Sequence, residues 1–123
     1  MQTEAQNSES LTRLVLDALD DLKAIDVRVL DVRQLTDVTD YMVVATGRSA
    51  RQVSALAEHV LMAAKQGGVT PLGVEGLRDG DWVLVDLCDV VVHVMQAEAR
   101  DSYQLEKLWA PPDANAVKVE GAP

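Results

Sequence analysis

The stretch from residue 82 to 95, WVLVDLCDVVVHVM, constrains the fold most, because it contains two strand-like halves with almost nothing between them. Both halves are rich in β-branched residues, and only Cys88 and Asp89 separate them. A two-residue turn at this point predicts a β-hairpin in which Leu87 faces Val90. Because side chains alternate between the two faces of a strand, one face becomes entirely aliphatic and must be buried. That face consists of Val83, Val85, Leu87, Val90, Val92 and Val94.

The opposite face of the hairpin holds the unusual residues of the stretch. On it Asp86 and His93 are diagonal neighbours, within reach of a hydrogen bond. A catalytic pair is disfavoured, because Cys88 lies in the turn and supplies no nucleophile beside the base. Zinc takes about four ligands, and His59, His93 and Cys88 are the chain's only nitrogen or sulfur donors. A structural Asp–His pair or a polar contact surface therefore fits better. This face consists of Trp82, Leu84, Asp86, Val91, His93 and Met95.

The remaining segments predict an α/β fold in one domain. Helices alternate with strands in the order α-β-β-α-β-β-β-α, which indicates a five-stranded mixed sheet packed with helices. We expect the domain at 9–109, with flexible segments at 1–8 and 110–123. The expected helices are 11–22, 49–66 and 98–109, and the expected strands are 26–32, 41–47, 70–76, 82–87 and 90–95.

Charge and composition exclude several classes of function. Lys and Arg number 11 against 20 Asp and Glu, which gives a net charge of −9. Such a chain repels nucleic acid and attracts basic proteins, so we expect no direct nucleic-acid specificity. One cysteine suits a reducing cytoplasm. No apolar run approaches the roughly 18 residues of a membrane span, and no signal peptide is recognisable. We expect a cytoplasmic protein without membrane contact.

The segment TGRSARQV at 46–53 has two interpretations. A glycine between a strand and a helix can bind phosphate at the helix N-terminus, although no P-loop motif is present. Alternatively, Ser49 and Gln52 form a capping box, with Gly47 allowing the tight turn. We favour the cap. Met42, Met62 and Met95 are expected in the core.

Four motifs occur together in a specific order and spacing: TDYMVVATGRSARQV, PLGVEG, DWVLVDLCDVVVHVM and EARDSYQLEKLW. With these motifs the chain resembles the ribosomal silencing factor family, also called Iojap-like proteins, over roughly residues 10–109. The last fourteen residues lie outside this resemblance. The family usually has glycine where this chain has Cys88, so the turn either carries strain here or is of another type.

The resemblance implies a fold related to nucleotidyltransferases, no enzyme activity and no cofactor. It implies that the protein binds the large ribosomal subunit through the fourteenth protein of that subunit. The bound factor blocks joining with the small subunit and represses translation when nutrients are scarce. Asp81 adds to an acidic surrounding of Trp82, which we expect to be at least half exposed. The implied contact residues are Gly73, Val74, Glu75, Trp82, Tyr103 and Glu106.

Two alternatives stay open. The first is a degenerate nucleotidyltransferase-like enzyme that uses Gly47, Ser49, Asp86 and Asp89, which are an incomplete version of that superfamily's metal-binding pattern. The second is a homodimer whose acidic face forms its own interface.

Overall fold

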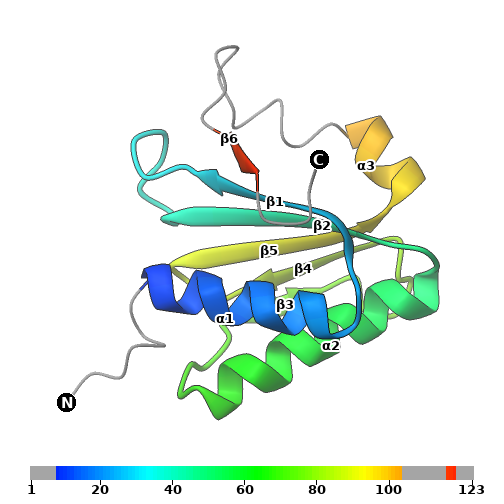
Figure 1. Cartoon of the computed structure of the whole chain (residues 1–123), viewed down its shortest axis with the longest axis horizontal. Helices are drawn as coiled ribbons and strands as arrows, with labels where there is room; N and C mark the ends of the chain where they lie inside the picture. The colour runs from blue at the N-terminus through cyan, green and yellow to red at the C-terminus, as the bar shows by residue number, and fades with distance from the viewer. Residues whose placement is uncertain (1–7, 104–115, 119–123) are drawn as a thin grey trace.

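The computed structural model describes residues 8–103 and 116–118, which form a mixed sheet with helices on both faces. The sheet order is β3-β4-β5-β2-β1-β6, and the pairing is antiparallel except between β2 and β5. Helices α1 and α2 lie on one face and α3 lies on the other (Figure 1). The helices are α1 (Ser8–Asp21), α2 (Ala50–Gln66) and α3 (Ala97–Tyr103). The strands are β1 (Ile25–Asp31), β2 (Tyr41–Gly47), β3 (Gly73–Glu75), β4 (Trp82–Asp86), β5 (Val90–Gln96) and β6 (Ala116–Lys118).

All five predicted strands are present, and β6 is an addition. Residues 116–118 pair antiparallel with Arg28, Val29 and Leu30 of β1, so the prediction of a flexible tail is wrong for them. A three-residue strand is too short to show a period of two in the sequence. The flexible N-terminal segment predicted at 1–8 is one residue too long, since α1 begins at Ser8. The rest of both segments lies outside the described residues.

The predicted hairpin register is confirmed. Asp86 pairs with Val91 and Leu84 with His93, and the Leu87 amide donates to the Val90 carbonyl at 2.9 Å. The six aliphatic residues of the predicted buried face are each at most 2% exposed. They join the apolar sides of α1 and α2 in a large cluster, which we call the helix-side core. The aliphatic face of the hairpin therefore supplies six of the 18 buried residues of the helix-side core.

A second, smaller cluster lies on the other face of the sheet, beneath α3. This back-face cluster consists of Leu30, Val32, Met42, Val44, Met95 and Ala99, with Trp82 packed against it. Met42 and Met95 are thus core residues as predicted. Met62 is not, because it lies on the outer side of α2 and is 56% exposed. None of the described helices is both long and apolar enough to cross a membrane.

The predicted cap of α2 is present in modified form. Ser49 Oγ accepts a hydrogen bond from the Gln52 amide at 3.1 Å, while Gln52 Oε1 accepts from the Arg48 amide at 2.6 Å. The return bond thus reaches one residue before the cap instead of the cap itself. A Cβ atom at Gly47 would lie 2.8 Å from a methyl group of Val53, so strand and helix approach too closely for a side chain here. These contacts explain the glycine and serine structurally.

Both outcomes that we considered for Cys88 in place of the family glycine occur together: its backbone is strained, and the turn is of another type. Its φ is +77°, and the next amide, that of Asp89, donates to the Leu87 carbonyl at 3.0 Å, which makes a γ-turn with positive φ. The Cys88 amide donates to Asp86 Oδ1 at 2.9 Å. The turn is therefore hydrogen-bonded but unfavourable for a residue with a Cβ atom.

Cys88→Gly is expected to raise the free energy of unfolding. Relief of the positive φ outweighs the greater freedom of glycine in the unfolded chain, for a net gain of about 0.5 to 1 kcal/mol. Urea denaturation of this variant beside Cys88→Ala gives the test, because alanine removes the thiol and keeps the Cβ atom. An equal gain in both variants would assign the effect to the thiol and not to the backbone.

Candidate interaction surface

The face of β3, β4 and β5 turned away from α1 and α2 forms a continuous surface. Across the sheet Glu75 pairs with Leu84, and Leu84 with His93. In the next row Gly73 pairs with Asp86, and Asp86 with Val91. Paired residues point to the same side of a sheet, so both rows belong to one face. We call the accessible part of it the open face, which consists of Gly73, Glu75, Trp82, Leu84, Asp86 and Val91.

The open face has an apolar centre and an acidic rim. The apolar centre consists of Leu84 and Val91, which are both half-buried. Glu75 at the sheet edge is exposed, and Asp86 beside the hairpin turn is half-buried. Among the described elements, α3 alone lies on this side of the sheet, next to the back-face cluster (Figure 1). An apolar centre with a charged rim is the usual composition of a protein-binding surface.

Trp82 is half-buried, so the prediction that at least half of it is exposed is wrong. Its indole Nε1 donates to His93 Nδ1 at 3.0 Å, and the two ring centroids are 5.8 Å apart. His93 is diagonal to Trp82 on the neighbouring strand, and the indole lies over that strand instead of projecting outward. Trp82 therefore forms one side of the open face, which we call its wall, and its indole is held in place by His93 instead of projecting freely into solvent.

Of the two interpretations left open for Asp86 and His93, the structural Asp–His pair does not form, because both side chains have other hydrogen-bond partners. Asp86 accepts a hydrogen bond from the Cys88 amide in the turn. The imidazole of His93 instead accepts a hydrogen bond from Trp82, its other diagonal neighbour. His93 is 5% exposed, and burial lowers its pKa to about 4. The imidazole is consequently neutral at neutral pH and serves as a fixed hydrogen-bond acceptor. A buried neutral histidine without a carboxylate partner has a structural role.

The structure brings together four of the seven predicted contact residues. Gly73, Glu75 and Trp82 belong to the open face, and the exposed Asp81 lies beside Trp82 at the start of β4. Val74 does not join them, because it pairs with Val85 and packs against the helix-side core.

The last helix can be compared with the prediction only in part. Tyr103 is the last described residue of α3, and Glu106 lies outside the described residues. Sequence reasoning did not select Leu84 and Val91 as contact residues. The alternation that placed Trp82 on this face places both of them there as well.

The four residues of the enzyme alternative lie at opposite ends of the sheet. The Asp89 carbonyl accepts from the amide of Tyr41, where β2 begins, whereas Gly47 ends that strand. A strand rises about 3.3 Å per residue, so roughly 20 Å separates the two ends. Asp86 lies with Asp89 at the hairpin turn, and Ser49 lies with Gly47. Elsewhere in residues 8–103 and 116–118, no three His, Cys, Asp or Glu side chains are grouped as a metal site.

Residues 5–123 match the family model described as "Ribosomal silencing factor during starvation". The chain belongs to the ribosomal silencing factor family. The match includes the last fourteen residues, which the motif resemblance excluded. A protein of Haemophilus influenzae called ribosomal silencing factor RsfS is 45% identical over 101 residues, which cover 82% of this chain and 99% of that protein.

A crystal structure and a more distant relative extend the comparison for this silencing-factor chain. The crystal structure of a Chromobacterium violaceum protein superposes with a TM-score of 0.82 at 43% identity, over 92% of this chain and 96% of that one. A mouse protein named "Mitochondrial assembly of ribosomal large subunit protein 1" is 34% identical over 89 residues. That match covers 70% of this chain and 39% of the mouse protein. The relatives of this chain thus include bacterial proteins named ribosomal silencing factors and a mitochondrial protein named for assembly of the ribosomal large subunit.

Proposed function

We propose that this protein binds the large ribosomal subunit through its open face, docks on the fourteenth protein of that subunit, and blocks joining with the small subunit. Translation is thereby repressed when nutrients are scarce. The observation that carries the proposal is the open face itself: a sheet surface with the half-buried Leu84 and Val91 at its centre and carboxylates at its rim. Membership of the silencing-factor family supports a ribosomal partner for that surface.

The charge around the open face favours a basic partner. Residues 73–89 carry Glu75, Asp79, Asp81, Asp86 and Asp89, against the single basic residue Arg78. Ribosomal proteins that contact RNA are commonly basic, and opposite charges at a rim accelerate encounter and fix orientation. The apolar centre then supplies affinity by excluding water.

The choice of the large subunit rests on two supports. The name of the mouse relative refers to assembly of the ribosomal large subunit. The four sequence motifs resemble a family that binds the fourteenth protein of that subunit on the face that meets the small subunit. A folded protein of 13.3 kDa seated there would occupy space that the small subunit needs.

Co-sedimentation separates binding from blocking. The protein should pellet with isolated large subunits and should not pellet with small subunits alone. When it is added before the small subunits, the yield of joined ribosomes should fall. Binding to large subunits without any change in joining would refute the blocking step and leave the docking step standing.

Leu84→Lys tests the open face directly. A charge at its apolar centre should weaken large-subunit binding at least about tenfold, because a central contact is lost and an ammonium group is buried. Met62→Lys is the matched control, since it places the same charge on an exposed apolar position of α2. Circular dichroism checks that both variants are folded.

Equal affinities of Leu84→Lys and Met62→Lys would remove the open face from the interface. If Leu84→Lys instead converted a dimer to a monomer in sedimentation velocity, the open face would be a contact between two copies of the chain.

A further inference from the structure

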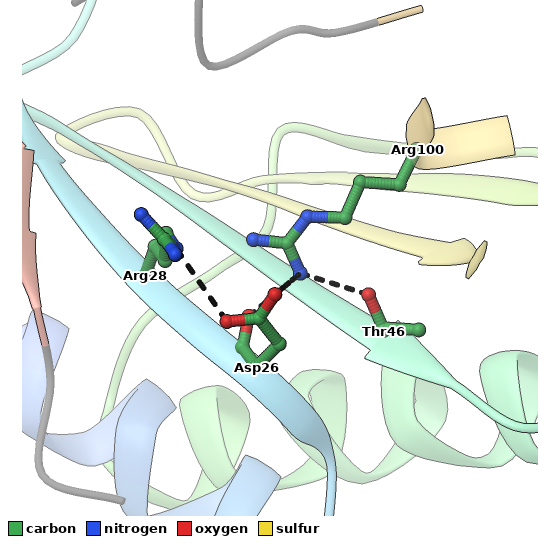
Figure 2. A network of polar contacts seen from close by, with 4 residues as sticks. All are labelled: Asp26, Arg28, Thr46 and Arg100. Atoms are coloured by element: carbon green, nitrogen blue, oxygen red, sulfur yellow. Dashed lines mark hydrogen bonds and ion pairs between the residues drawn. The ribbon is translucent and has the colours of Figure 1, made fainter. Parts of the chain in front are cut away.

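Arg100 of α3 is a buried arginine that joins three separate parts of the fold (Figure 2). It is 8% exposed. Its Nη1 donates to the Asp26 carbonyl oxygen at 2.6 Å and to Thr46 Oγ1 at 2.8 Å. The Asp26 carboxylate is farther away, at 3.8 Å, and its side chain is 40% exposed. Of these three contacts, the two short hydrogen bonds are therefore stronger than the ion pair.

The acceptor on β1 exists because that strand has a bulge. Ile25 pairs with Thr46 and Arg28 with Val44, so Asp26 and Val27 both stand opposite Ala45. Asp26 has φ of +51°, which bends the strand away from the regular ladder. A bulge leaves a backbone group outside the ladder, and the guanidinium of Arg100 satisfies the carbonyl of Asp26.

The described part of the helix that carries Arg100 comprises seven residues. A stretch of this length is not stable as a helix by itself in water, so contacts with the sheet must hold it. The neighbouring residue Ala99 is a buried member of the back-face cluster, which also contains Met95 and against which the partly buried Trp82 packs. Arg100 thus anchors the polar side of the helix while Ala99 anchors the apolar side, and α3 lies beside a wall of the open face.

We propose that Arg100 is a positioning residue for the open face: by clasping the β1 bulge and Thr46 it holds α3 in place beside Trp82. The partner then meets a preformed surface and does not lose affinity by ordering the helix. The binding part of this inference rests on the proposed function, whereas the clasp itself can be measured without a partner.

Hydrogen exchange measures the clasp directly. Arg100→Met keeps most of the side-chain volume and removes both hydrogen bonds, so amide exchange in residues 97–103 should become at least about tenfold faster. Exchange in β2 and β5 should change little. Arg51→Met on α2 is the matched control, because Arg51 is exposed. Unchanged exchange in α3 of Arg100→Met would overturn the proposal.

Three further variants separate the hydrogen bonds from the charge. Thr46→Val removes one acceptor with little change in shape and should accelerate α3 exchange less than Arg100→Met does. Asp26→Asn keeps the carbonyl and tolerates the positive φ, so it should have the smallest effect. Arg100→Lys should accelerate α3 exchange less than Arg100→Met does, but exchange should stay faster than in wild type, because an ammonium group lacks the planar fork of a guanidinium. A larger effect of Asp26→Asn than of Thr46→Val would contradict the hydrogen-bond clasp. These milder variants also keep the test available if Arg100→Met does not fold.

Binding to purified large subunits completes the test. If wild type binds, Arg100→Met should bind at least about fivefold more weakly, and Arg51→Met should match wild type. Faster α3 exchange with unchanged affinity would refute the role of Arg100 in positioning the open face. Absence of binding by wild type would instead refute the proposed function, while faster α3 exchange in the same variant would still support the clasp.

Discussion

Gly76→Ala is expected to lower the free energy of unfolding by about 3 kcal/mol or more, because strain and overpacking act together there. Gly76 has φ of +90°, which a residue with a Cβ atom adopts at a cost. An added Cβ would also lie 2.1 Å from the Trp82 carbonyl oxygen. That oxygen belongs to the backbone of β4, so relief requires a shift of the strand and not a rotation of a side chain.

Gly73→Ala is the matched control for this prediction, three residues earlier in the same GVEG motif. Nothing lies within 4 Å of a Cβ atom built there, and its φ is not positive. Its unfolding free energy should stay within about 0.5 kcal/mol of wild type. Urea denaturation of both variants gives the comparison. Similar stabilities for the two variants would show that the backbone of β4 shifts at little energetic cost and that Gly76 is not structurally required.

The same pair of variants separates fold from contact in the GVEG strand. Gly73 belongs to the open face, so Gly73→Ala can reduce large-subunit binding without affecting stability. Gly76→Ala should affect binding through the position of β4. A family motif of this kind therefore combines a residue required by backbone geometry with residues available to a partner.

The hairpin could be predicted from sequence because its two halves alternate strictly around a two-residue turn. Val83, Val85 and Val92 then fall on one side whatever the rest of the chain does, and each is fully buried. The exposure of Trp82 could not be derived in the same way. It depends on a hydrogen bond to a diagonal neighbour, and the alternation of strands assigns a face but not the direction of a large side chain on it.

The clasp of Arg100 was missed for a different reason. Its acceptor depends on a bulge in β1, where the sequence DVRVLD alternates as an ordinary strand and has no glycine to mark the positive φ of Asp26. The segment at 116–118 gave no signal for similar reasons, since pairing with an existing edge needs little side-chain pattern. Features that arise from contacts between distant segments are therefore the ones that local patterns do not contain.

Acidification is expected to destabilise the protein through His93. Burial lowers the pKa of this imidazole to about 4, whereas its ordinary value is 6.5. Below pH 6.5 His93 becomes protonated in the unfolded chain but stays neutral in the folded chain. The free energy of unfolding therefore falls as the pH is lowered. The loss continues until the folded imidazole is protonated near pH 4, and it reaches about 3 kcal/mol over this window. Above pH 6.5 this histidine contributes no pH dependence.

His93→Gln isolates this contribution. The amide oxygen of glutamine can accept the hydrogen bond from the Trp82 indole, but it does not titrate, so the fall in stability between pH 6.5 and 4 should be smaller by up to about 3 kcal/mol. His59→Gln is the control for the loss of an imidazole, because His59 joins α2 to Asp21 of α1, far from the open face.

Urea denaturation at several pH values, followed by circular dichroism, provides the measurement for all three proteins. The free energy of unfolding should fall steeply below pH 6.5 in wild type and in His59→Gln. It should fall less in His93→Gln. Parallel curves for all three would mean that folded His93 takes up its proton near pH 6.5, as the unfolded chain does, and is therefore protonated below that pH. The imidazole could then no longer accept from Trp82, and the wall that this pair gives to the open face would have to be held in another way.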